Sequence, residues 1–282
     1  MKIFSILKII INPKLIGYII SKVYIRWYEK FSYNFKINGE EHLLKSLPHE
    51  EIKVIFDVGS NVGDWTKMAF TRFNDATIHT FEISNNSFII LQKNFFNKKQ
   101  IILNNYGLSK MIGKVNFKDF GNSEKSELNT IIDNSDFYDK KLKSKINTCY
   151  VTTGDIYCEE RNISNIDLLK IDVEGAEHYV LEGFAQMLKK KAIKVIQFEY
   201  GYNNGDVKFL IKDFYLMLKK YGYVIGPLKQ EGVIFMNFEY GLNDFNSGPN
   251  YVAVLEDNLN LIKKINGKKI KGYPRLTRDI FD

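Results

Sequence analysis

The sequence predicts an α/β domain in which helices cover both faces of a largely parallel sheet. Short apolar runs typical of buried strands alternate with segments whose apolar residues recur at helical spacing. The first such pair spans residues 53–73, and a glycine-bearing turn joins its strand, which ends in Asp57, to its helix. In open α/β sheets ligands bind beyond the carboxyl ends of the strands, so we expect the functional site at that edge.

The composition is that of an ordinary globular protein. The chain has 282 residues, of which 45% are hydrophobic and 26% charged, enough for one large domain with a sizeable core. Cys149 and Cys158 are too few for a disulfide scaffold and lack metal-ligand spacing, as do the four histidines. Free thiols in a reducing compartment are therefore favoured, and we expect a cytoplasmic protein.

The net charge of +7 is concentrated at the two ends of the chain. Residues 1–30 and residues 263–282 each carry a surplus of five basic residues, which leaves the rest of the chain net −3. A nucleic-acid enzyme would more often carry its basic groups across the catalytic face. We therefore expect no nucleic-acid partner.

The first residues form a separate basic segment. Lysines and Pro13 interrupt its apolar clusters, so neither a transmembrane helix nor a secretory signal is predicted. We expect a basic amphipathic helical extension over 1–35 that packs on the domain or on a partner subunit, or lies on an anionic membrane surface. The main domain is expected over 36–258, and a basic tail over 259–282.

The first turn reads D-x-G-x-N-x-G, with Asp57, Gly59, Asn61 and Gly63 at its fixed positions. The dinucleotide fingerprint G-x-G-x-x-G would need glycine at positions 61 and 64, where Asn61 and Asp64 stand. Glycines let the backbone approach a ligand closely, and the following helix offers free amides. The spacing therefore disfavours a nicotinamide dehydrogenase.

A second acidic residue supports a nucleoside ligand. Residues 77–82 are predicted to form the next strand, which ends in Glu82. A carboxylate there is placed to accept both ribose hydroxyls of an adenosine. The third strand, 101–106, ends near Asn105 and Leu108, where an adenine would lie.

Residues 107–165 interrupt the alternation of strands and helices. Short strands are expected at 115–117 and 146–153, and a polar stretch over 121–145 separates them. An insertion of this length more often covers a substrate than serves as a plain loop, and disorder in 121–145 is the alternative. We therefore expect 107–165 to be a substrate cover.

Charged residues occupy the predicted fourth strand, 167–173. Alternation places Lys170, Asp172 and Glu174 on one face, and Glu199 ends the fifth strand. A central parallel strand is normally apolar on both faces, and buried charges seldom add stability. These four residues are therefore candidate catalytic groups.

The remaining elements complete the sheet. A connecting helix is predicted within 35–52, and further strands at 223–225, 233–238 and 251–255.

Three segments carry a family resemblance. They read V-I-F-D-V-G-S-N-V-G-D-W-T, I-H-T-F-E-I-S and I-D-L-L-K-I-D-V-E-G-A-E-H-Y-V-L-E-G-F. Together they resemble the FkbM family of S-adenosylmethionine-dependent methyltransferases over residues 53–200, with a continuation to 256. The resemblance implies a class I, Rossmann-like methyltransferase fold whose seven-stranded sheet has an antiparallel last strand.

The resemblance also implies S-adenosylmethionine as cofactor and O-methylation of a hydroxyl, typically on sugars of surface polysaccharides and glycolipids or on natural products. The cofactor's methionine end is assigned to Asp57, Gly59, Asn61 and Gly63, its ribose to Glu82, and the substrate side to Lys170, Asp172 and Glu174. The chain departs from the family at Tyr106-Gly107, where Ala-Leu-Ser is common, so the adenine contacts are less defined.

Two roles remain open for Asp172 and Glu199. One of them accepts the hydroxyl proton directly, or the two hold a divalent metal that acidifies the hydroxyl. A nucleic-acid methyltransferase is disfavoured, because an amino-group enzyme would show Asn/Asp-Pro-Pro-Tyr/Phe where the chain has Asp172-Val173-Glu174-Gly175. A non-catalytic cofactor-binding module is disfavoured by the intact charged residues.

Overall fold

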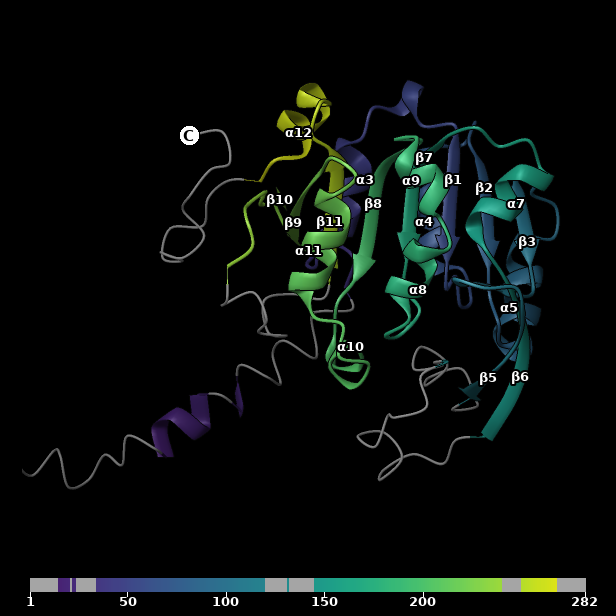
Figure 1. The fold of residues 1–282 in the computed structure, drawn as a ribbon, viewed down its shortest axis with the longest axis horizontal. Helices are drawn as coiled ribbons and strands as arrows, with labels where there is room; N and C mark the ends of the chain where they lie inside the picture. The colour runs from purple at the N-terminus through teal and green to yellow at the C-terminus, as the bar shows by residue number, and fades with distance from the viewer. Residues whose placement is uncertain are drawn as a thin grey trace, which may run out of the picture.

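In the computed structural model, the chain is built around two β-sheets (Figure 1). The structure describes residues 15–20, 22–23, 34–119, 131, 145–239 and 250–267. The strands of the main sheet are β1 (Val54–Val58), β2 (Thr77–Phe81), β3 (Ile101–Asn104), β7 (Ile166–Ile171), β8 (Ile193–Glu199), β9 (Tyr223–Lys229), β10 (Gly232–Val233) and β11 (Asn250–Leu255). Their order is β10-β9-β11-β8-β7-β1-β2-β3.

This order confirms the predicted fold class. Strands β3, β2, β1, β7 and β8 are parallel neighbours, and β11 runs antiparallel to both β8 and β9. The seven expected strands are joined by a two-residue eighth, β10, at the edge. A strand over 233–238 was wrong in extent, since only Gly232 and Val233 are strand residues there. Pro227 of β9, which has no N–H to donate, lies at the point where this pairing ends.

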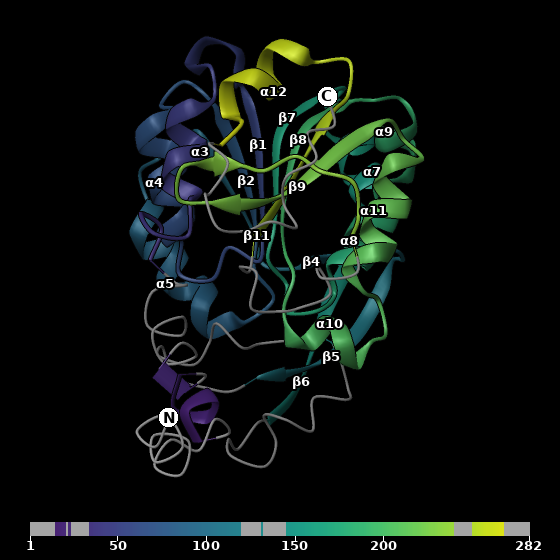
Figure 2. The same cartoon turned by 90° about the vertical axis from the view of Figure 1, so that its left-hand side faces the viewer.

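Helices cover both faces of the sheet, as Figure 2 shows. The helices on one face are α3 (Glu40–Ser46), α4 (Asp64–Arg72), α5 (Asn85–Phe95) and α12 (Leu259–Ile265). The helices on the other face are α7 (Gly154–Glu160), α8 (Glu177–Glu182), α9 (Ala185–Lys189) and α11 (Ile211–Lys219). Two apolar cores, one on each side of the sheet, therefore hold the three layers together.

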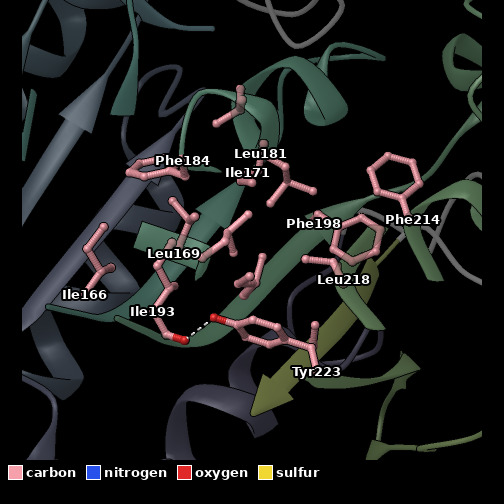
Figure 3. Close-up of a cluster of buried hydrophobic side chains, with 14 of the residues drawn as sticks. Ile166, Leu169, Ile171, Leu181, Phe184, Ile193, Phe198, Phe214, Leu218 and Tyr223 are labelled. Carbon is pink, nitrogen blue, oxygen red and sulfur yellow. Dashed lines mark hydrogen bonds between the residues drawn. The ribbon is translucent and has the colours of Figure 1, made fainter. Parts of the chain in front are cut away.

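The larger core fixes the two central strands (Figure 3). Leu169 of β7 and Phe198 of β8 are fully buried in it, and Phe198 stacks on Phe214 of α11 at 4.7 Å between ring centroids. The Tyr223 hydroxyl donates to the carbonyl oxygen of Ile193 at 2.6 Å, which joins β9 to the start of β8. The carboxyl ends of β7 and β8 are thereby held on a rigid base.

A small second sheet lies beyond the carboxyl ends of the main strands, beside β3 (Figure 1). Its strands are β4 (Gly107–Leu108), β5 (Gly113–Asp119) and β6 (Lys145–Thr152), in the order β4-β6-β5. The strands expected at 115–117 and 146–153 are therefore present, the first of them longer than expected. Of the predicted polar stretch 121–145, only residues 131 and 145 are described.

The ends of the chain are described in part. Residues 15–20 and 22–23 are helical and exposed, and the rest of the expected extension up to residue 33 lies outside the described residues. No helix in the described ranges is long and apolar enough to cross a membrane. The expected connecting helix 35–52 is α3 followed by the 3₁₀ turn η1 (His49–Glu51). In the basic tail, α12 packs on the domain, and residues 268–282 lie outside the described residues.

Candidate active site at the carboxyl edge

The glycine-bearing turn after β1 is fixed by its neighbours. Gly59 has φ +82°, and a Cβ on it would lie 1.7 Å from the carbonyl oxygen of Asp172. Gly63 has φ +93°, and a Cβ there would lie 2.4 Å from the Phe95 ring. Between them Asn61 also has positive φ, 47°. Glycine is thus required at both positions, because the turn crosses the end of β7 and then packs on α5.

Glu82 lies at the end of β2 directly beside this turn. Its carboxylate is 6% exposed and accepts from the amides of Asn61 at 2.8 Å and Ser84 at 2.7 Å. Burial raises the pKa of Glu82 to about 7, against the opposing effect of those two amides. Each carboxylate oxygen has two lone pairs, so each can accept one further donor. The Asn105 side chain donates to the Glu82 carbonyl oxygen at 2.9 Å, which places it beside the same strand end.

The other adenine-site candidate, Leu108, is buried in β4, which pairs with β6 rather than with the main sheet. The structure thus brings Asn61, Glu82 and Asn105 together. Contact of Leu108 with a bound adenine stays a prediction.

Asp57 lies in β1, immediately before the turn. Its carboxylate is fully buried, accepts from the Thr66 hydroxyl of α4 at 2.5 Å, and lies 3.4 Å from the Lys170 ammonium. Burial raises its pKa, and Lys170 opposes that shift. The predicted direct contact of Asp57 with the cofactor stays a prediction. Its observed contacts hold α4 and Lys170 in place.

Lys170 is the central cation of the site. Its ammonium lies 3.0 Å from an Asp172 oxygen, 3.4 Å from Asp57 and 3.4 Å from the carbonyl oxygen of Gly59. It also lies 5.8 Å from the centroid of the Trp65 ring. Burial alone would lower the pKa of Lys170, but the carboxylates of Asp172, Asp57 and Glu40 outweigh it and raise the pKa. Lys170 is therefore a fixed charge and not a proton donor at neutral pH.

The predicted strand face of Lys170, Asp172 and Glu174 needs correction. Strand β7 ends at Ile171, and Glu174 has φ +54° in the turn that follows. Asp172 and Glu174 are thus loop residues, because the chain leaves the sheet before the third charged position. Even so, single carboxylate oxygens of Asp172, Glu174 and Glu199 lie within 4.8 Å of one another.

Asp172 and Glu199 have opposite pKa shifts. Burial and the nearby charges of Asp172 and Glu174 raise the pKa of Glu199 well above its usual range. Burial would also raise the pKa of Asp172, but the Lys170 ammonium and a hydrogen bond from Glu199 outweigh it and lower the pKa. The two shifts run in opposite directions, so the site favours the ionised form at Asp172 and the protonated form at Glu199. The spacing of the three carboxylates is also suited to a divalent cation.

The residues that join the loop after β7 to helix α10, which follows β8, were not predicted from the sequence. Glu177, fully buried at the start of α8, accepts from the amides of Val173 and Gly175 and from the Asn204 side chain at 2.8 Å. Helix α10 (Tyr202–Asp206) carries both Asn204 and Asn203, and the Asn203 side chain donates to Glu174 at 2.7 Å. The E-G-A-E spacing was the available signal for Glu177. Asn203 and Asn204 come after β8 in the sequence, but their side chains donate to Glu174 and Glu177, which come after β7. No local pattern in the sequence indicates these contacts.

Comparison with known proteins identifies the family. Residues 57–225 match the methyltransferase FkbM domain, which is more than half of the chain. The chain belongs to the FkbM methyltransferase family. The resemblance seen in the sequence is thereby confirmed. A relative, the hexuronic acid methyltransferase AglP of Haloferax volcanii, is 26% identical over 180 residues, which cover 63% of this chain and 70% of that protein.

Similar solved structures include an FkbM methyltransferase from Methylobacillus flagellatus, with a TM-score of 0.44 and 12% identity, covering 72% of this chain. The match spans 43% of the length of the M. flagellatus chain. A Streptococcus mutans protein solved in complex with SAH has a TM-score of 0.40 and 10% identity, covering 76% of this chain and 94% of that chain.

Proposed function

We propose that this FkbM methyltransferase uses S-adenosylmethionine to methylate a hydroxyl of a sugar in a surface polysaccharide or glycolipid. Family membership supports methyl transfer, and the hexuronic acid methyltransferase among its relatives supports a sugar substrate. One observation carries the hydroxyl as acceptor. It is the Asp172 carboxylate, which lies 3.0 Å from the Lys170 ammonium and close to Glu174 and Glu199, at the edge where ligands of this fold bind.

The described residues fit the cofactor. The buried Glu82 carboxylate accepts from two backbone amides and has acceptor capacity left for further donors, such as ribose hydroxyls. The turn through Gly59, Asn61 and Gly63 passes directly beside it. Glu82 would hold the ribose, and this turn the methionine end.

The cofactor supplies an already activated methyl group, so the protein's task is to align the acceptor and to take up a proton. Lys170 fixes the Asp172 carboxylate at 3.0 Å. Asp172 would accept the proton that the acceptor hydroxyl loses as its oxygen takes the methyl group from the cofactor's sulfonium, whose methyl C–S bond breaks to leave a neutral thioether. Glu199 would stabilise the Asp172 carboxylate by hydrogen bonding. Asn203 and Asn204 of α10 donate to Glu174 and Glu177, and so hold the loop after β7 next to α10.

The cofactor assignment is tested by calorimetry. A hydrogen bond to a charged group is worth ~1.5–3 kcal/mol, so Glu82→Ala weakens S-adenosylmethionine binding at least tenfold. Asp75→Ala, which removes an exposed carboxylate between α4 and β2, is the matched control and binds like the parent. Parental affinity in Glu82→Ala, or tight binding of NAD by the parent, contradicts the assignment.

The substrate assignment is tested by turnover on a panel of sugar nucleotides, lipid-linked and surface glycans, natural-product hydroxyls and nucleic acids. We expect methyl transfer to a glycan and an alkali-stable methyl ether in the product. An alkali-labile methyl ester would place the methyl group on a carboxylate and contradict O-methylation of a hydroxyl. Cofactor binding without turnover of any panel member would favour a non-catalytic binding module.

A further inference from the structure

The small sheet has one buried face and one open face. On the buried face, Phe117 of β5 and Cys149 and Val151 of β6 form a core of their own. On the open face, Ile146 and Tyr150 of β6 are 69% and 48% exposed. The open face of an antiparallel sheet is normally polar, because it is in contact with water. The apolar side chains on this face therefore need an explanation.

The pairing of β5 with β6 shows what surrounds the exposed groups. Directly paired residues of antiparallel strands lie on the same face, so Lys114 lies beside Tyr150 and Asn116 beside Thr148. The Thr148 hydroxyl donates to the Asn116 side-chain oxygen at 3.1 Å, which joins the two strands on this face. The exposed Lys114 side chain makes no ion pair with any residue that the structure describes. The open face is thus both apolar and cationic.

The turn that leads into β5 carries the same kinds of side chain. Met111 and Ile112 are both about half exposed, and lysines stand at positions 110 and 114 on either side of them. We call this exposed set the outer patch, and its members are Met111, Ile112, Lys114, Ile146 and Tyr150. Exposed apolar side chains that gather in one part of a surface mark a site of interaction.

The small sheet is also strongly basic. Residues 107–119 and 145–152 contain four lysines and a single acidic residue, Asp119, which is buried. Lys110 lies 3.8 Å from Glu182 of α8, whereas Lys114 and Lys145 have no such partner within the described part of the chain. A partner that covers this face must therefore accept apolar side chains and compensate lysine charges.

The outer patch lies at the same end of the molecule as the candidate active site. Figure 1 and Figure 2 both show the small sheet beyond the carboxyl ends of the main strands, with the N-terminal helical residues 15–20 at that end as well. Apolar side chains of this helix, such as Ile16 and Ile19, are also exposed. Two basic and apolar surfaces from distant parts of the sequence therefore lie at one end of the protein.

An anionic bilayer matches this combination of side chains. Aliphatic groups and a tyrosine can enter the boundary between headgroups and acyl chains, while lysines remain among the anionic headgroups. A nucleic acid or a soluble glycan could stack on Tyr150, but it would leave Met111, Ile112 and Ile146 in water. A single weak contact gives only reversible membrane binding, and stable attachment takes two signals. The N-terminal segment and the outer patch would supply one each.

We propose that the outer patch is a second membrane contact, which acts together with the basic N-terminal segment and holds the candidate active site close to an anionic bilayer. The inference deepens the proposed function and rests on it for the acceptor, which would be a glycan on a lipid carrier rather than a free sugar. The contact itself is a property of the surface and is measured without turnover.

The first test locates the contact. Thr148→Cys in the full-length protein is labelled with the environment-sensitive fluorophore NBD and mixed at low salt with vesicles of phosphatidylcholine and phosphatidylserine. Cys149 and Cys158 are buried, so the introduced thiol is the accessible one. We expect the emission to shift to the blue and to be quenched by nitroxide-labelled lipid. Leu259→Cys, at an exposed position of α12 at the opposite end of the molecule, is the control and keeps its emission in water.

The second test removes the apolar side chains. The double variant Ile146→Ser/Tyr150→Ser is expected to bind the same vesicles at least ~5-fold more weakly than the parent, because neither serine can replace the buried apolar contact. Leu216→Ser/Leu259→Ser is the matched control, since it removes two exposed leucines of α11 and α12, and it binds like the parent. Cofactor affinity is expected to be parental in both double variants.

Each possible outcome supports or overturns the proposal. Emission at position 148 that stays typical of water, or parental binding by Ile146→Ser/Tyr150→Ser, overturns it. A blue shift that needs no vesicles and grows with protein concentration also overturns it and assigns the patch to a second copy of the chain. A shift caused by RNA or a soluble glycan, but not by vesicles, assigns it to that partner instead. If the double variant does not fold, the labelled Thr148→Cys protein decides alone.

Failure of this inference is distinguishable from failure of the proposed function. A protein that docks through position 148 but methylates no glycan retains the membrane contact and loses the proposed function. A protein that methylates a glycan while position 148 stays in water retains the function and loses the contact.

Discussion

At the scale of single residues, the site is governed by one buried cation and an excess of carboxylates. Lys170 has Asp57, Asp172 and Glu40 acting on it, and Glu199 lies next to Asp172. One ammonium cannot neutralise four carboxylates in a low-dielectric site, so the protonated form is favoured at some of them, and the pKa of Glu199 is raised well above its usual range.

Cofactor affinity should depend on pH through Glu82. The free carboxyl has a pKa of about 7, and ribose hydroxyls that donate to it stabilise the ionised form and lower that pKa. Binding near neutral pH therefore releases a proton, and affinity rises as the pH increases from about 6 to about 8. Calorimetry in buffers of different ionisation enthalpy measures this release. Glu82→Gln is the control and should abolish the Glu82 contribution. A parent whose binding heat does not depend on the buffer contradicts the assignment.

Turnover should depend on Asp172. Asp172→Asn removes the proton acceptor and lowers turnover ~10²–10⁴-fold, the usual worth of a positioned base. Cofactor affinity stays near parental, because Glu82 and the glycine turn are unchanged. The loss of a like charge also lowers the pKa of Glu199, so the residual activity rises with pH at lower values than in the parent. Near-parental turnover would move the base to Glu199 or Glu174. Lost cofactor binding in a folded variant would place Asp172 in the cofactor site.

Chelation should leave turnover unchanged within about twofold. The three carboxylates are close enough to hold a divalent cation. However, Asp172 is already neutralised by Lys170 at 3.0 Å, and that ammonium would repel a second cation. Turnover is compared before and after EDTA treatment, with Mg²⁺, Mn²⁺ or Zn²⁺ added back. A loss restored by one metal would assign Asp172, Glu174 and Glu199 as its ligands.

At the scale of elements, the site depends on the contact between the turn after β1 and the loop after β7. The turn after β1 packs on the loop after β7 at Gly59, and α10 holds the latter through Asn203 and Asn204. The backbone at Gly59 has no room for a side chain. Stability and ligand geometry are therefore linked at this contact.

Gly59→Ala should lower the free energy of unfolding by at least ~2 kcal/mol, because its Cβ would collide with the Asp172 backbone and φ is positive. Gly201→Ala is the matched control, since a Cβ on Gly201 has nothing within 4 Å, and we expect a change within ~0.5 kcal/mol. Denaturant titration measures both. Equal stability of Gly59→Ala and the parent would show that the two loops can separate without cost.

The elements also show what could be predicted from the sequence. The turn through Gly59 could be predicted because an apolar run followed by glycines is a local pattern. The position of Glu82 could be predicted because it ends the next apolar strand. The period-2 pattern of Lys170, Asp172 and Glu174 could not reveal that β7 ends at Ile171. Glu40 was missed because its partner Gln197 is 157 positions away, and only the folded sheet brings them together.

At the scale of the whole molecule, the basic N-terminal segment suggests attachment to an anionic membrane. Described apolar side chains in it, such as Ile20 and Val23, are more than 60% exposed. Each lysine near an anionic surface contributes ~1 kcal/mol, and salt screens this attraction. Deleting residues 1–30 should abolish sedimentation with anionic vesicles at low salt and leave cofactor affinity unchanged. Full-length protein that never sediments would favour packing on the domain or dimerisation.

Because Lys170 is buried, its chemical modification can report how often the turn after β1 and the loop after β7 move apart. Its side chain is 6% exposed and its charge is held by carboxylates, whereas Lys194 at the start of β8 is 42% exposed. An amine reacts with an acylating reagent only when it is reachable and has lost its proton. Lys170 should therefore be acylated only during transient openings in which the turn after β1 separates from the loop after β7. Its rate of modification relative to Lys194, followed by mass spectrometry, would measure how often those openings occur and how far a bound cofactor suppresses them.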